Sequence, residues 1–272
     1  MTEIRLRTVD AFTERPFSGN PAAVVMLDEA PPDEWMLALA REMNVSDTAF
    51  VIRETSSDVD FRLRWFTPRM EVDLCGHATL ASAHCLLEDG VASPIRFATR
   101  SGVLTISQRG DGSLAMDFPA SPPMQMGVPS GLVDSLDAQV EWVGRGGNNM
   151  LLALVADERT VRELTPDIAG VARIDALAVI ATAVADVGRP HDFVSRVFAP
   201  NAGIDEDPVT GSAHTVLAPF WADRLDRQAL VGLQASARPG LVGVECTGDR
   251  VIVLGKAVTL TDGLLRVAAH PS

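Results

Sequence analysis

Residues 64–90, RWFTPRMEVDLCGHATLASAHCLLEDG, decide the fold, because they have a counterpart later in the chain. They run from a strand-like pattern through a proline into an Ala-rich helical pattern. Residues 195–225, SRVFAPNAGIDEDPVTGSAHTVLAPFWADRL, do the same. Once the Phe-x-Pro segments are aligned, matching Gly76 with Gly211 requires three extra residues in the second loop. Internal similarity of this kind indicates a structural repeat, so we predict two halves with the same fold.

The helix of each repeat, predicted at residues 76–88 and 211–224, carries almost no charge in its first three turns. A helix that is apolar on nearly all sides is enclosed by other structure. We therefore predict an α/β (α+β) protein of two pseudo-symmetric halves, each a curved, barrel-like β-sheet around a central α-helix. The halves are expected at residues 1–118 and 132–272, with the last strand able to cross back to the first half. The Pro- and Gly-rich residues 118–131 are the predicted linker.

Composition excludes several classes of protein. Hydrophobic residues make up 47% of the chain and charged residues 22%, as in a globular protein with a core. The net charge of −13 disfavours nucleic acid as a partner. The charged N-terminus offers no signal peptide. The apolar run at residues 176–185 is about half the length of a membrane span and is predicted to be a buried strand.

The three cysteines, Cys75, Cys85 and Cys246, are an odd number without close metal-binding spacing. They indicate free thiols in a reducing compartment, so we expect a soluble, cytoplasmic protein with no membrane partner. Lys256, the only lysine, lies in a strand pattern. A Schiff-base site needs a pocket lysine, and a phosphate-binding loop needs one after its glycines. No Gly-x-Gly-x-x-Gly follows a strand, so neither a cofactor nor a metal is expected.

Five blocks of the sequence carry a resemblance to a known family: VDAFTERPFSGNPAAVV, MNVSDTAFV, DLCGHATLASAH, DEDPVTGSAH and QASARPG. In this order they resemble the PhzF-like phenazine-biosynthesis family, a branch of the diaminopimelate-epimerase fold, over nearly the whole chain. The resemblance implies a cofactor-independent isomerase that transfers a proton on a small, anionic, carboxylated metabolite in a cleft between the halves. It also implies a homodimer. The best-known activity of the family isomerises a dihydro-hydroxyanthranilate.

Asp47 is the candidate proton carrier, because it occupies the position where members of the family usually carry a glutamate. Read without the family, it is a simple turn aspartate. A carboxylate in a desolvated cleft can take up and return a proton. Aspartate is one methylene shorter than glutamate, which changes its reach by roughly 1.5 Å. This departure puts the particular phenazine substrate in doubt.

His77, Asp207 and Ser212 are the other candidate catalytic residues. His77 follows Gly76 at the first turn of a central helix, where it could donate to a substrate carboxylate or shuttle a proton; the alternative is a packed or capping histidine. By resemblance, Asp207 would bind substrate or orient His77, and Ser212 would donate from the second helix N-terminus. Asp-Pro is also a common turn opener, and serine is a common first residue of a helix.

Two other functions stay open. In diaminopimelate epimerase and proline racemase, which share the fold, two cysteines act as the base and the acid. Here Cys75 occupies the first position, but the repeat places Thr210 at the second, which disfavours an amino-acid epimerase or racemase. The other alternative is a non-catalytic binding protein on the same scaffold, which would not need a general base.

The predicted substrate-binding residues flank the catalytic ones. Helix N-termini bind anions through N–H groups that lack intrahelical partners, and the repeat brings two of them to the cleft. The flexible loop at residues 144–149 adds Arg145 as a candidate for an anionic group, and His214 is a candidate for lining the site. The predicted set is Asn20, Ser46, Cys75, Gly76, Thr210 and Gly211.

Overall fold

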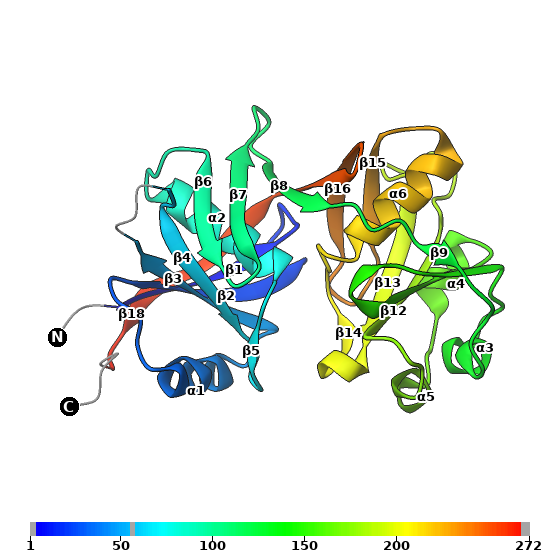
Figure 1. Cartoon of the computed structure of the whole chain (residues 1–272), viewed down its shortest axis with the longest axis horizontal. Helices are drawn as coiled ribbons and strands as arrows, with labels where there is room; N and C mark the ends of the chain where they lie inside the picture. Colours follow the sequence, from blue (N-terminus) through cyan, green and yellow to red (C-terminus); the bar gives the residue numbers. More distant parts are fainter. Residues whose placement is uncertain (1–3, 55–57, 268–272) are drawn as a thin grey trace. The chain divides into compact units, whose positions relative to one another are not determined.

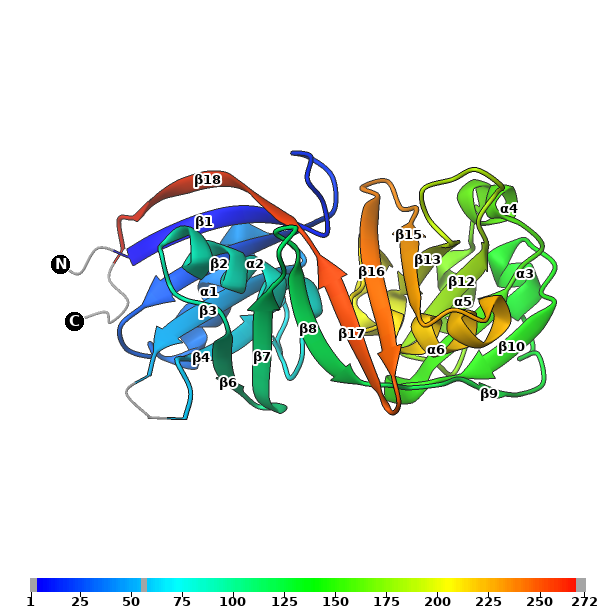
Figure 2. The same cartoon turned by 90° about the horizontal axis from the view of Figure 1, so that it is seen from above.

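The structure, a computed structural model, describes residues 4–54 and 58–267 of the chain. Contacts within the chain divide it into two compact units, Met1–Asp117 with Leu254–Ser272, and Phe118–Val253. Each unit consists of a curved sheet with a few helices (Figures 1 and 2). The predicted mixed α/β class, with a barrel-like sheet and a central helix in each half, is confirmed.

The sheet of the first unit winds around one buried helix. β1 lies antiparallel to both β2 and β18, so that the C-terminal strand runs beside the N-terminal one (Figure 2). β2 is parallel to β3, and β3 is antiparallel to β4. The elements are β1 (Ile4–Ala11), β2 (Asn20–Leu27), α1 (Asp33–Met43), β3 (Asp47–Arg53), β4 (Phe61–Phe66), β5 (Glu71–Val72), α2 (Gly76–Glu88), β6 (Ile95–Thr99), β7 (Gly102–Gln108), β8 (Leu114–Pro119) and β18 (Ala257–Leu265).

Helix α2 has the predicted bounds, 76–88, and is buried along almost its whole length. It contacts β1, β2, β3 and β18, and Figure 1 shows it within the curve of these strands. Because a helix enclosed in this way has no solvent-facing side, it carries no charged stripe. The low charge that singled it out in the sequence is therefore a consequence of its central position.

The second unit repeats the strand pairing of the first. β10 is antiparallel to β9 and β11, β11 is parallel to β12, and β12 is antiparallel to β13. Thus β9 takes the place that β18 has in the first unit. The elements are β9 (Met124–Gln125), α3 (Leu132–Leu136), β10 (Trp142–Arg145), η1 (Gly147–Asn149), β11 (Met150–Leu154), α4 (Glu158–Glu163), α5 (Ile168–Ala172), β12 (Ala178–Val184), β13 (Phe193–Ala199), η2 (Pro200–Ala202), β14 (Ile204–Asp207), α6 (His214–Leu225), β15 (Ala229–Gln234), β16 (Gly240–Thr247) and β17 (Arg250–Gly255).

The repeat extends to side-chain contacts. Arg64 makes a bidentate ion pair with Glu71, with both N–O distances 2.7 Å. Arg196 makes the same pair with Glu206, at 2.7 and 2.8 Å. In both units the guanidinium also lies over the ring of the phenylalanine two residues later, at 5.2 and 5.0 Å from its centre. The two partners are separated by 7 residues in the first unit and by 10 in the second, which accounts for the three inserted residues.

Two predicted boundaries differ from the observed ones. The second central helix, predicted from residue 211, begins at His214, because the preceding residues form a tight turn in which the N–H of His214 donates to the Gly211 carbonyl. The predicted linker, residues 118–131, contains β9, and its Ser121 N–H donates to the Thr215 carbonyl at 3.0 Å. Pro219 lies four residues after Thr215 and has no N–H to fill that carbonyl within the helix. The linker therefore packs as part of the second unit.

The apolar run at residues 176–185 forms β12, whose first six residues are buried between β11 and β13. The prediction of a buried strand is confirmed. Within the described ranges, no helix is both long and apolar enough to cross a membrane.

Candidate active site

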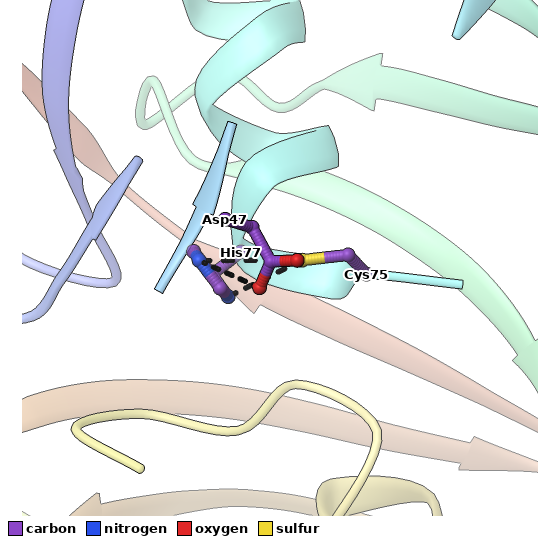
Figure 3. Close-up of side chains that lie close together, drawn as sticks. All are labelled: Asp47, Cys75 and His77. Carbon is purple, nitrogen blue, oxygen red and sulfur yellow. Dashed lines mark hydrogen bonds and ion pairs between the residues drawn. The ribbon is translucent and has the colours of Figure 1, made fainter. Parts of the chain in front are cut away.

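Three reactive side chains converge in the first unit (Figure 3). Asp47 is the first residue of β3, Cys75 is the N-cap of α2, and His77 is the second residue of that helix. His77 Nε2 lies 3.7 Å from Asp47 Oδ2, and Cys75 Sγ lies 3.4 Å from His77 Nδ1. The three residues are 6%, 7% and 5% exposed in chain order, so their polar atoms face one another in a nearly dry environment.

The sheet explains why these residues meet. β2 and β3 are parallel and begin at the same edge, where Ala22 pairs with Asp47. Asn20, the first residue of β2, is completely buried at this edge. Its Nδ2 donates to His77 Nδ1 at 3.2 Å. Because an amide N–H can only donate, the proton of a neutral His77 then sits on Nε2, the nitrogen that faces Asp47.

Burial determines the charge of His77. Desolvation lowers the pKa of its imidazole from 6.5 to about 3. The ring is therefore neutral at neutral pH. It can offer an N–H from Nε2 to a substrate oxygen or to the Asp47 carboxylate without first losing a positive charge.

The second unit holds Asp207, at the end of β14, and Thr210, whose hydroxyl donates to the Asp207 carboxylate. Gln234, at the end of β15, binds the same loop with both ends of its amide. Its Oε1 accepts from the Thr210 N–H at 2.8 Å, and its Nε2 donates to the Asp207 carbonyl at 2.7 Å. Gln234 is fully buried. Sequence reasoning quoted its block, QASARPG, without assigning the glutamine a role.

His214 supports this loop from the helix side. It is fully buried, and its Nδ1 donates to the Thr210 carbonyl at 2.9 Å. Burial lowers the pKa of its imidazole to about 4, so the ring is neutral. Ser212 is half-buried in the tight turn before α6, and its carbonyl accepts from the Thr215 hydroxyl at 2.8 Å. His214 is thus a support for the residues that precede it.

The equal folds of the two units carry unequal chemistry. Strand register aligns Trp65 with Val197, which places the two carboxylates at non-equivalent positions. Where one unit has an acid, the other has an apolar residue. The pairs related by the repeat are Asp47 and Ala178, Val72 and Asp207, Cys75 and Thr210, and His77 and Ser212.

Comparison with known proteins places this arrangement in a family. A family model described as phenazine biosynthesis-like protein (PhzC-PhzF) matches residues 9–263. The chain belongs to the phenazine biosynthesis-like family. An uncharacterized isomerase of Pseudomonas aeruginosa is 47% identical over 267 residues, which cover 97% of this chain and 100% of that protein. The resemblance seen in the five sequence blocks is confirmed.

Solved structures agree with the family. The crystal structure of a PhzF-family phenazine biosynthesis protein from Enterococcus faecalis matches with a TM-score of 0.91 and 37% identity, covering 98% of this chain and 100% of that one. A hydroxyproline epimerase from Agrobacterium vitis matches with a TM-score of 0.62 at 13% identity, covering 97% and 92%. The second match shows a shared fold alone.

Other predicted residues of this family member take varied places. Gly76 is buried as the first residue of α2, and Gly211 is buried in the turn before α6. Ser46 is half-buried in the bend that precedes β3. Arg145 donates to the Asn149 side chain and, at 2.7 Å, to the Asp175 carbonyl. Its guanidinium therefore braces its own loop, a role that the predicted contact with an anionic substrate did not include.

Gly19 is a test of how tightly the phenazine biosynthesis-like site is held. It has a φ of 67°, and a Cβ added to it would lie 2.2 Å from the Ala11 carbonyl oxygen. We expect Gly19→Ala to lower the free energy of unfolding by about 2–3 kcal/mol, since strain and a backbone clash combine. Urea denaturation measures the loss. Gly90 is the matched control, with a φ of 84° and open space around it; Gly90→Ala should cost only about 1 kcal/mol. Equal losses would contradict the clash.

Proposed function

We propose that this protein is an isomerase that transfers a proton on a small carboxylated metabolite, without a cofactor or metal in that step. Asp47 is the proton carrier, and His77, Asp207 and Ser212 are its partners. The observation that carries the proposal is the buried pair of Asp47 and a neutral His77, 3.7 Å apart, in a member of the phenazine biosynthesis-like family. Relatives named as isomerases support the reaction class.

The chemistry follows from these two groups. The Asp47 carboxylate takes a proton from one substrate carbon and returns it to another, as a general base and then a general acid. The Nε2–H of His77 donates to substrate oxygen, where negative charge develops while the proton is on Asp47. The nearly dry surroundings strengthen that hydrogen bond. Asn20 keeps the imidazole in the required tautomer through its 3.2 Å contact with Nδ1.

An anionic substrate suits the start of α2. The first N–H groups of a helix lack intrahelical partners and attract a carboxylate. The protein's net charge of −13 opposes this attraction at long range, but salt screens distant charges over about 10 Å. A shared cleft between the halves, a homodimer and a cytoplasmic location stay predictions from the sequence.

The racemase alternative is disfavoured by the residue related to Cys75. A two-thiol mechanism needs a second thiolate, but the repeat places Thr210 there, and its hydroxyl donates to the Asp207 carboxylate. A threonine hydroxyl does not ionise near neutral pH and does not replace a thiolate as the base. Cys75 therefore carries no proton in the proposed reaction.

Identification of the substrate is the direct test. The protein is incubated with a metabolite extract, and bound species are released and identified by mass spectrometry. Each is then turned over in deuterium oxide, beside dihydro-hydroxyanthranilate and free amino acids. We expect isomerisation with deuterium in the product, because the Asp47 carboxylate exchanges with solvent between the two transfers. An isomerised substrate whose turnover did not depend on Asp47 would overturn the proposal.

Gln234 is expected to act as a positioning residue in the same reaction. Gln234→Leu removes three hydrogen bonds from the loop of Asp207 and Thr210. Because misplacement by about 1 Å can cost 10²-fold in rate, we expect kcat to fall by about 10- to 100-fold with a smaller change in KM. Steady-state kinetics well below the Tm measure this. The control is Gln228→Leu at an exposed glutamine. An unchanged kcat in folded Gln234→Leu would leave Gln234 a purely structural role.

A further inference from the structure

We propose that Asp47, Cys75 and His77 also form a binding site for a thiophilic divalent cation such as Zn²⁺. The ligand atoms of these three residues all lie within 4.8 Å of one another, and all three side chains are buried. The binding rests on this geometry alone, whereas its effect on catalysis rests on the proposed function.

The donor set suits zinc. Carboxylate oxygen, thiolate sulfur and imidazole nitrogen are the ligands that zinc takes in proteins, and three protein ligands leave its fourth position for water or another small ligand. The thiolate selects softer ions over Mg²⁺ and Ca²⁺. Cys75 is the N-cap of α2, and a helix N-terminus stabilises a thiolate. With Asp47 and Cys75 both anionic, a divalent cation gives a site of zero net charge, which lowers the cost of keeping it out of water.

The distances require little rearrangement. Zinc–ligand bonds of about 2.0–2.3 Å place neighbouring tetrahedral ligands about 3.3–3.7 Å apart. His77 Nε2 is already 3.7 Å from Asp47 Oδ2 and 4.0 Å from Cys75 Sγ. Small side-chain rotations therefore suffice to bring the three atoms around one ion. β3 and α2 hold the residues from two regular elements, so the backbone need not move (Figure 3).

Asn20 completes the site as an outer ligand support. When Nε2 binds the cation, its proton moves to Nδ1, and the Cys75 thiol releases its own proton to solvent. A half-turn of the Asn20 amide then presents its oxygen to Nδ1–H, across the contact that is 3.2 Å long in the metal-free arrangement. Metal-bound histidines characteristically donate their second ring N–H to such an oxygen, which fixes the ring.

An occupied site stops the proposed reaction. The cation takes the Asp47 lone pair that would accept the substrate proton and the Nε2 that would donate to substrate oxygen. Zinc is then an inhibitor that acts at the proton-transfer centre.

Cobalt titration tests the binding without any substrate. Untagged metal-free protein is titrated with Co²⁺. We expect a thiolate-to-cobalt charge-transfer band, the intense visible bands of tetrahedral Co²⁺, and one ion per chain by native mass spectrometry. Zn²⁺ should displace the Co²⁺, whereas Mg²⁺ should not. Cys75→Ser should lose the charge-transfer band and bind Zn²⁺ more than about 100-fold more weakly, since even outer-ligand changes cost 10- to 100-fold. Cys246→Ser, a half-buried cysteine elsewhere, should bind as the parent does.

A charge-transfer band that survived in Cys75→Ser or disappeared in Cys246→Ser would overturn the proposal, as would the absence of tetrahedral bands in the parent. Asn20→Ala keeps every ligand and should weaken binding by about 10- to 100-fold; unchanged affinity would remove its supporting role. Circular dichroism confirms that each variant is folded. A normal cobalt spectrum beside an active Asp47→Asn enzyme contradicts the proposed function alone. No cobalt binding beside an inactive Asp47→Asn contradicts the metal site alone.

Discussion

Asp47→Asn is expected to lower turnover by about 10²- to 10⁴-fold, the effect typical of removing a general base. Asparagine has the size of aspartate and keeps a hydrogen-bonding end, but its amide does not accept the substrate proton. The Tm should change little, since the variant creates no cavity beside His77. Turnover of the identified substrate and thermal unfolding measure the two quantities. Deuterium incorporation into product should fall together with turnover, because both depend on the same carboxylate.

Cys75→Ser is the informative comparison for this variant. The thiol contacts His77 at 3.4 Å but carries no proton in the proposed reaction, so its replacement should be mild. An inactive Cys75→Ser beside an active Asp47→Asn would contradict proton transfer by the carboxylate. That outcome would support thiol-dependent epimerisation.

The protein is expected to lose stability steeply in mild acid, because two buried histidines resist protonation. Burial lowers the pKa from 6.5 to about 3 for His77 and to about 4 for His214. Above pH 6.5 both rings are neutral in the folded and the unfolded chain. Below it, the unfolded chain binds protons that the folded one does not, so the free energy of unfolding falls until the folded pKa values are reached. Together the two rings predict a loss of about 4 kcal/mol between pH 7 and pH 5.

Urea denaturation at intervals between pH 7 and pH 5 measures this loss. His214→Gln keeps a donor for the Thr210 carbonyl but does not titrate, so it should remove about half of the pH dependence. A surface histidine would not produce this effect, since its pKa changes little on unfolding. If His214→Gln lost stability between pH 7 and pH 5 as steeply as the parent, the buried neutral state of His214 would be wrong.

Several features were predictable from local pattern. The repeat predicted two halves of one fold, and residues 76–88 form α2 as expected, since a glycine-led apolar run with few charges has one stable arrangement within a sheet. The run at residues 176–185 formed a buried strand for a similar reason. The second helix did not follow its pattern to the residue, because its first turn is tightened by bonds such as His214 N–H to the Gly211 carbonyl. Helix ends depend on such local bonds more than helix interiors do.

What the sequence determined by itself is the repeat, the central helices, the family, and the candidacy of Asp47 and His77. Only the tertiary structure decided that Asn20 orients His77, that Gln234 holds the loop of Asp207, and that Cys75 joins the cluster as a third donor. The physical reason is distance along the chain. Periodicity and capping patterns report contacts within a few residues, whereas Asn20 and His77 are 57 residues apart and meet at 3.2 Å. Such a contact exists only after two parallel strands and a helix begin at the same edge of one sheet.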